Sequence, residues 1–279
     1  ARARSPANLR RPTLAEAMKR TFGREAHVVS LSLKDRAAVL MAGKLGSSVD
    51  GEERDLVASY SSMTGTFETS LAYSSGGSPF LERFNGTHPV DRYLNEPWTL
   101  LDRAHAARPE LDPYADVGPD DNVLEAELFA SRVFPRRMPA DIGALYAKLS
   151  ASPAGNELVL AAARSAIAAF DLGADPTPDL LCISFSSNDS VGHECGPVSW
   201  EVRDMSRRAD LLLADLLRYL DGERHLAGKY CVIATADHGV GPLLRAEFPP
   251  QATKRPWRID EGEMIAHVER ALDARFSPR

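Results

Sequence analysis

The sequence predicts an α/β fold, with a mostly parallel sheet that carries helices on both faces. Residues 179–186 and 230–236 are apolar runs without polar alternation, a pattern typical of strands that are buried on both sides. Each run is followed by an amphipathic segment of helical periodicity, at residues 198–220 and 261–276. Because buried strands alternate with helices along this part of the chain, we expect parallel strands joined by helical crossovers.

The composition is that of a folded protein without a strongly basic surface. The 279 residues are 44% hydrophobic and 26% charged, which is enough apolar material for one large domain or two small ones. The formal charge of -6 gives no sign of a nucleic-acid partner. No apolar run reaches the ~18 residues that a membrane-spanning helix requires. Three cysteines cannot form a disulfide framework, and Cys182 and Cys231, which lie in the apolar runs, are expected to be buried.

The chain is expected to have three parts, at residues 1–85, 86–154 and 155–279. The first part is the beginning of the α/β core. Its predicted elements are a helix at 13–20, a strand at 27–33, a helix at 34–43 that ends at Gly43, strands at 56–60 and 66–73 around a turn at Gly65, and a helix at 78–85.

The middle part, residues 86–154, is rich in Pro, Asp and Arg and has weak periodicity. It is predicted to be a long irregular insertion that lies over the core. A plain connecting loop is the alternative, although loops of this length are usually ordered and functional. The last part opens with an Ala- and Leu-rich helix at 155–172 and contains the two apolar strands.

Two pairs of acid and imidazole side chains follow the two apolar strands. Asp189 and His193 come just after the first strand, and Asp237 and His238 end the second. Ligands of open α/β sheets bind beyond the carboxyl ends of the strands, so both pairs are expected at one edge. Asp189 and His193 could reach one metal ion from a turn, and Gly239 would let the other pair converge. Such nitrogen and oxygen ligands suit zinc, manganese or iron in a hydrolytic site.

Each pair also has a purely structural explanation. Asp189 and His193 could belong to a solvated loop with an Asx turn, and Asp237 could cap the next segment beside an incidental His238. For one pair taken alone, the structural explanation is stronger than the metal-site interpretation. Two such pairs after two buried strands favour a metal site.

A third polar cluster follows the strand predicted at residues 27–33. Lys34 and Arg36 are two residues apart at its end, so their side chains could point the same way. A point charge beside a bidentate guanidinium is well suited to holding a phosphoryl group. An ordinary exposed pair is the alternative. Together, the three clusters indicate a two-metal site for phosphoryl transfer.

The segments SLKDRAAVLMAGKLG, SFSSNDSVGHECGP and ATADHGV resemble the alkaline phosphatase superfamily. They are most like phosphate-irrepressible bacterial alkaline phosphatases with a Thr nucleophile, and the neighbouring type I phosphodiesterase/nucleotide pyrophosphatase group. The paired D-x-x-x-H and A-D-H-G motifs are specific to the superfamily, and S-L-K-D-R to the subgroup. The resemblance extends over most of the chain, including TFETSLAY and FLERFN, and implies the alkaline-phosphatase-like fold.

The resemblance implies a site with two zinc ions. Asp189 and His193 would hold the zinc that activates the attacking water. Asp237 and His238 would hold the zinc that binds the oxygen of the nucleophile.

The resemblance also implies a small phosphate-ester substrate. Lys34 and Arg36 would contact the phosphoryl oxygens that are not transferred, a pair that goes with phosphomonoesters in the family. Relatives of this kind are typically exported, so a periplasmic or secreted location is expected.

Other family features are absent from the sequence. The resemblance places the first strand with its metal-binding Asp, the Thr nucleophile and a phosphate-binding Asn before residue 1, and a last metal-binding His after residue 279. His267 lies in a helical pattern and is interpreted as helix surface. We therefore expect an internal segment with four of six metal ligands, no nucleophile, and weak or absent zinc binding on its own.

Three functions follow from these observations. The first is a metal-dependent phosphomonoester hydrolase that acts through a Thr phospho-enzyme. The second is a phosphodiesterase or nucleotide pyrophosphatase of the same superfamily. The third is a catalytically inactive domain that keeps the fold for binding or for a structural role.

Overall fold

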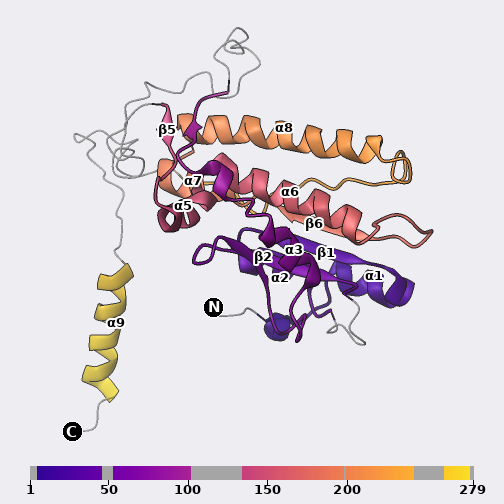
Figure 1. Cartoon of the computed structure of the whole chain (residues 1–279). Coiled ribbons are helices and arrows are strands. Elements are labelled where there is room, and N and C mark those ends of the chain that lie inside the picture. The colour runs from indigo at the N-terminus through magenta and orange to yellow at the C-terminus, as the bar shows by residue number, and fades with distance from the viewer. Residues whose placement is uncertain (1–4, 46–52, 102–133, 198, 242–260, 277–279) are drawn as a thin grey trace. The chain divides into compact units, whose positions relative to one another are not determined.

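The computed structural model describes residues 5–45, 53–101, 134–197, 199–241 and 261–276 (Figure 1). The chain divides into two compact units, Ala1–Gly241 and Pro242–Arg279, and each is described by itself. The second unit contributes one described helix. The boundaries expected near residues 85 and 154 stay a prediction.

The first unit is built on a four-stranded sheet with the strand order β3-β2-β1-β6. Both neighbours of the central strand β1 run parallel to it, and β3 pairs antiparallel with β2 at one edge. The strands are β1 (Val28–Ser32), β2 (Leu56–Ser61), β3 (Thr66–Thr69) and β6 (Leu180–Ser184). The prediction of an α/β fold with a mostly parallel sheet is confirmed.

Helices cover both faces of this sheet, as predicted (Figure 1). α2 (Asp35–Ala42) contacts β1, β2 and β6 on one face, and α1 (Leu14–Phe22) packs against α2. α6 (Pro153–Ala169) lies on the other face, with α8 (Trp200–Gly222) outside it and α3 (Pro79–Gly86) beside it.

Strand β1 shows why both faces need a cover. All five of its residues are buried, and Val28 and Val29 are fully inaccessible. Successive side chains of a strand point to opposite faces, so Val28 belongs to the cluster of α1 and α2, and Val29 to the cluster of α6. A strand that is buried at every position is stable only between two helical layers.

α1 begins and α2 ends where the sequence predicts. Thr13 caps α1 through a capping box with Glu16, in which each side chain meets the backbone N–H of the other residue. Gly43 ends α2 with a φ of 76°. A Cβ atom at Gly43 would lie 2.4 Å from Oγ1 of Thr13, so only glycine fits between the two helices.

The middle part is more regular than predicted. Within residues 86–154, the irregular assignment is wrong for residues 142–151, which form α5 (Ile142–Lys148) and η6 (Leu149–Ala151). The N-cap Asp141, whose side chain accepts a hydrogen bond from the N–H of Ala144, begins this helix. Residues 102–133 of this part lie outside the described residues. The remaining short elements are η1 (Pro6–Asn8), η2 (Gly23–Glu25), η3 (Asp91–Tyr93) and the antiparallel pair β4 (Pro97–Trp98) and β5 (Arg136–Arg137).

The second apolar run does not form the predicted buried strand. Residues 230–236 have no ladder partner among the described residues, and Val232 and Ile233 are 46% and 78% exposed. The expectation that Cys231 is buried is also wrong, because it is exposed. Apolar composition favours a strand only where a neighbouring strand supplies hydrogen bonds and a layer covers the side chains.

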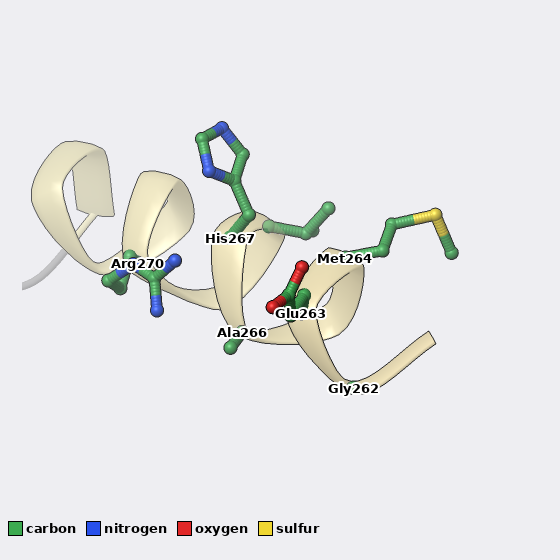
Figure 2. Close-up of a pocket in the computed structure, with 7 residues that line it drawn as sticks. Gly262, Glu263, Met264, Ala266, His267 and Arg270 are labelled. Carbon is green, nitrogen blue, oxygen red and sulfur yellow. The ribbon is translucent and has the colours of Figure 1, made fainter. Parts of the chain in front are cut away.

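The second unit contributes α9 (Glu261–Phe276), which confirms the helix predicted there. A hollow of about 810 Å³ lies along it, lined by seven residues of this one helix (Figure 2). His267 is exposed on this helix, as expected for a surface residue. None of the helices in the described part of the chain has the length and apolarity needed to cross a membrane.

Candidate active site

The first acid–imidazole pair lies on a helix rather than in a turn. β6 leads directly into α7 (Ser187–Cys195), so the expected turn geometry is wrong. Asp189 and His193 are four positions apart and therefore share one face of α7. The Oδ1 atom of Asp189 lies 3.1 Å from Nε2 of His193.

The opposite face of α7 is packed. Val191 and Cys195 lie two positions beyond the polar pair, which turns them about 200° around the helix axis. Both are buried, in a cluster with Trp98 and Met205. α7 thus presents its polar face because its apolar face is held against α8 and the β4–β5 pair.

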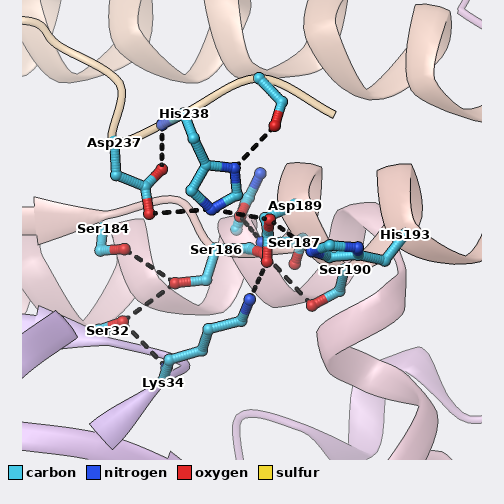
Figure 3. Close-up of polar contacts among 12 residues, drawn as sticks. Ser32, Lys34, Ser184, Ser186, Ser187, Asp189, Ser190, His193, Asp237 and His238 are labelled. Atoms are coloured by element: carbon cyan, nitrogen blue, oxygen red, sulfur yellow. Dashed lines mark hydrogen bonds and ion pairs between the residues drawn. The ribbon is translucent and has the colours of Figure 1, made fainter. Parts of the chain in front are cut away.

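Lys34 reaches this polar face from the end of β1. It is the N-cap residue of α2, and its Nζ atom forms an ion pair with Oδ2 of Asp189 (Figure 3). Its backbone N–H donates to Oγ of Ser32 at 2.9 Å. The hydroxyls of Ser32 and Ser184 lie 3.0 and 2.8 Å from that of Ser186, so a chain of serines joins the ends of β1 and β6 below Lys34.

The second acid–imidazole pair approaches the same carboxylate. Nε2 of His238 lies 3.5 Å from Oδ1 of Asp189 and 3.4 Å from Oδ2 of Asp237 (Figure 3). Nδ1 of His238 donates to the carbonyl oxygen of Gly239 at 2.7 Å, which leaves Nε2 available as a ligand. The structure therefore brings both predicted pairs to one place.

A close contact holds the two segments together. A Cβ atom at Gly192 on α7 would lie 2.6 Å from Cγ2 of Val240. The chain after His238 can lie against α7 only because position 192 has no side chain. Gly192 belongs to the D-x-x-x-H motif, and its role could have been suspected from its place between Asp189 and His193.

Arg36 is not part of this cluster. It lies in the first turn of α2 and is exposed, and no hydrogen bond or ion pair of its side chain with the two acid–imidazole pairs is found in the described structure. Lys34 and Arg36 belong to the start of α2 and not to β1. The alternation of side chains along a strand, which would point both the same way, therefore does not apply to them. Both nevertheless line a groove of about 390 Å³ between α2 and the ends of β2 and β3.

Charges around the cluster shift two pKa values. Burial raises the pKa of the Asp189 carboxyl, but the hydrogen bond and charge of Lys34, followed by His193 and His238, bring it below its usual value. The Gly239 carbonyl and then the Asp237 carboxylate raise the pKa of the exposed His238. Asp189 is thus kept ionised as the common negative charge of the site.

The donor set suits a divalent cation. Oδ1 of Asp189 is buried and accepts no hydrogen bond, although it faces two imidazole nitrogens. An orphaned carboxylate oxygen beside two imidazoles has the chemistry of a zinc ligand. No group of three or more His, Cys, Asp and Glu side chains within the described ranges is arranged to hold an ion. The residues therefore fit part of a metal site.

Sequence reasoning missed the buried residue Asn156 on α6. It is fully inaccessible and bonds to the first turn of α7, below Asp189. The available signal was an amide next to Gly155 inside an otherwise Ala- and Leu-rich helix.

Comparisons with known proteins agree with this fold. Residues 147–269 match the family described as type I phosphodiesterase / nucleotide pyrophosphatase. The chain is 30% identical over 248 residues to alkaline phosphatase PhoV of Synechococcus elongatus, covering 88% of this chain and 42% of that protein. It is 32% identical over 277 residues to alkaline phosphatase PafA of Elizabethkingia meningoseptica, covering 98% and 47%.

A solved structure of wild-type alkaline phosphatase PafA has the same fold. It superposes with a TM-score of 0.65 and 29% identity, covering 80% of this chain and 40% of that chain. The chain spans less than half the length of each of these relatives.

The parallel sheet with a polar edge of carboxylates, imidazoles and a lysine is the α/β fold of relatives that are named alkaline phosphatases. The comparisons support a place for this chain in the alkaline phosphatase superfamily.

Proposed function

We propose that this chain supplies a large part of the catalytic domain of a metal-dependent phosphomonoester hydrolase. The observation that carries the proposal is the convergence of Lys34, His193 and His238 on the single carboxylate of Asp189 at the carboxyl edge of the sheet. Cationic and metal-ligating groups around one small space are the elements that stabilise a phosphoryl transition state. The proposed substrate is a small phosphate ester.

The metal sites are assigned to the two acid–imidazole pairs. Asp189 and His193 would hold one zinc ion, and Asp237 and His238 would hold the other, with further ligands completing each site. When bound, two such ions would supply Lewis-acid charge to the attacking and leaving oxygens. With two ligands per ion from the described residues, binding by this segment alone is expected to be weak or absent.

Lys34 and Arg36 are assigned to the phosphoryl oxygens. Lys34 already lies in the cluster, whereas Arg36 would reach the phosphoryl group from the rim of the shared groove. A second solved structure is of PafA with a Thr, an Asn, a Lys and an Arg substituted, and that Lys and Arg are two positions apart, as Lys34 and Arg36 are. This spacing supports a common role for the pair.

The proposed reaction proceeds through a phosphorylated Thr, which the resemblance places ahead of residue 1. The Thr oxygen attacks phosphorus, the bond from phosphorus to the alcohol oxygen breaks, and that oxygen takes up a proton. Water then attacks the phosphorylated Thr and releases inorganic phosphate. Lys34 would offset the negative charge of the oxygens that stay on phosphorus in both steps.

Substitution of the shared carboxylate tests this assignment. Asp189→Asn in the natural protein should lower phosphomonoesterase kcat/KM by at least about 100-fold, because it removes a metal ligand and the partner of Lys34. Asp91→Asn is the matched control, since Asp91 forms an exposed pair with His88 at 4.0 Å elsewhere. Unchanged activity of Asp189→Asn would refute the proposed site.

A phosphodiesterase or nucleotide pyrophosphatase activity is the second candidate, because the matched family carries that description. The two candidates differ in how many negative charges the substrate carries. Steady-state rates on a nitrophenyl monoester and a bis-nitrophenyl diester would separate them. A strong diester preference would mean that Lys34 and Arg36 do not serve a phosphoryl dianion.

An inactive domain that keeps this fold for binding or for structure is the third candidate. Titration calorimetry with zinc separates it from an enzyme. If neither this segment nor the natural protein binds zinc, and the natural protein has no activity, the domain is inactive. For the active enzyme we propose a periplasmic or secreted location, which fractionation of the source cells would test.

A further inference from the structure

α6 and α7 meet more closely than helices with ordinary side chains can. At the start of α6, a Cβ atom on Gly155 would lie 2.4 Å from Oγ of Ser187, 2.7 Å from Cδ1 of Leu33 and 2.8 Å from the carbonyl oxygen of Leu149. Two of these three neighbours are side chains packed in the interior and one is backbone, so none can move aside freely. The glycine therefore sets how closely the first turn of α7 approaches α6.

Asn156 uses this close approach to bind the first turn of α7. Its Oδ1 atom accepts the backbone N–H of Ser187 at 3.1 Å, and its Nδ2 atom donates to Oδ1 of Asn188 at 2.8 Å. Asn156 is 0% exposed. An amide without solvent access is stable only while its hydrogen bonds are made, so Asn156 holds α7 at one rotation and one height.

The two residues that Asn156 binds come directly before Asp189. No side chain of Ser186 caps α7, so the amide of Asn156 satisfies one of the first N–H groups of the helix in its place. A rotation of α7 by one residue would turn Asp189 by about 100° around the helix axis, away from Lys34 and His238. The orientation of the shared carboxylate therefore depends on the contact below it.

We propose that Asn156, seated by Gly155, is a positioning residue for Asp189 and so for the metal ion assigned to Asp189 and His193. The inference rests on the proposed function, because it assigns Asp189 as a metal ligand. Asn156 lies on α6 and acts only through the backbone of Ser187 and the side chain of Asn188. Its proposed role is to position Asp189 rather than to contact substrate or ion.

The chain offers a matched control for an alanine substitution. Asn85, on α3, also makes two hydrogen bonds through its amide, both of them to backbone: its Oδ1 atom accepts the N–H of Phe67 at 3.0 Å, and its Nδ2 atom donates to the carbonyl oxygen of Phe67 at 2.9 Å. Asn85→Ala removes two amide hydrogen bonds to the edge strand β3. A loss of zinc affinity that merely follows a loss of stability should therefore appear in both variants.

The experiment measures zinc affinity in the natural protein by competition with a chelator, together with the thermal unfolding midpoint of the metal-free form. Asn156→Ala should weaken the binding of one zinc ion by about 10- to 100-fold, whereas Asn85→Ala should lower the unfolding midpoint and leave zinc affinity unchanged. Asn156→Asp keeps the acceptor for Ser187 and loses the donor to Asn188, so we expect an intermediate effect.

The outcomes separate this inference from the proposed function. If Asp189→Asn also weakens zinc binding and Asn156→Ala does not, Asn156 is merely structural and the inference is overturned. If Asp189→Asn leaves zinc binding unchanged, the metal assignment itself fails, and the inference fails with it. Should Asn156→Ala not fold, the weaker variant Asn188→Ala removes only the side-chain partner and must lower zinc affinity for the inference to stand.

Discussion

Two acid–imidazole pairs of similar sequence are held at the site in different ways. The first pair lies on α7, whose other face is buried against α8, and the Asp189 side chain is only 18% exposed. The second pair follows residues 230–236, which have no ladder partner among the described residues, and the Asp237 side chain is 85% exposed. An acid–imidazole pair can therefore be held in place by its own helix, or it can depend on contacts with a neighbouring element.

The largest loss of stability is expected when the buried ion pair of the packed region is broken. Arg136 and Glu201 form an ion pair with side chains 1% and 0% exposed, which fastens β5 to the first turn of α8. Arg136→Met leaves the carboxylate of Glu201 without this partner and should lower the free energy of unfolding by about 3–5 kcal/mol. Asp237→Ala in the exposed segment should change it by less than about 0.5 kcal/mol. If urea denaturation shows the same loss of unfolding free energy for both variants, the proposed difference between the packed and the exposed region is contradicted.

The reaction rates of two cysteines allow a direct comparison of strand β6 with the exposed segment 230–236. Burial raises the pKa of the Cys182 thiol on β6 to about 11, whereas Cys231 is exposed. The thiolate reacts, so at pH 8 an aromatic disulfide reagent should modify Cys231 about 100-fold faster than Cys182.

The control for this measurement is Cys231→Ser, which should abolish the fast phase. Slow reaction of all three cysteines would mean that residues 230–236 are covered in the natural protein.

A smaller effect is expected from the contact that seats α7. Gly155→Ala should lower the free energy of unfolding by about 1–3 kcal/mol, because its Cβ atom would enter space filled by Ser187 and Leu33. Gly222→Ala is the control, since a Cβ atom there meets nothing within 4 Å. Chemical denaturation of both variants measures the difference, and a neutral Gly155→Ala would show that α6 and α7 can separate.

The smallest change in stability is expected from the charge of Asp189. Its pKa is lowered in the folded protein, so its contribution to stability is fully present above the ordinary value of about 3.9 and is lost as the pH falls below it. In metal-free protein, the difference in unfolding free energy between wild type and Asp189→Asn should therefore shrink on acidification from pH 6 to pH 3. A difference that grows over this range would show that Lys34 does not stabilise the carboxylate.

Local sequence patterns predicted the elements that are stabilised by residues close to them in the sequence. The helix start at Thr13, the helix end at Gly43 and the strand β1 are determined by neighbouring residues, and all three were predicted. Prediction was weaker for elements that are stabilised by contacts with residues distant in the sequence. The helix α7 was expected to be a turn, because its polar composition hid the apolar pair Val191 and Cys195 on one side.

The sequence by itself determined the fold class, the order of most elements and the identity of the side chains at the edge of the sheet, because hydrophobic period and residue chemistry are local properties. Only the tertiary structure decided that Lys34 and both imidazoles meet at Asp189, that Arg36 stands apart, and that residues 230–236 lie exposed. Such distances depend on how α6, α7 and β1 pack, and packing is set by residues more than 100 positions apart, as Ser32 and Ser186 are.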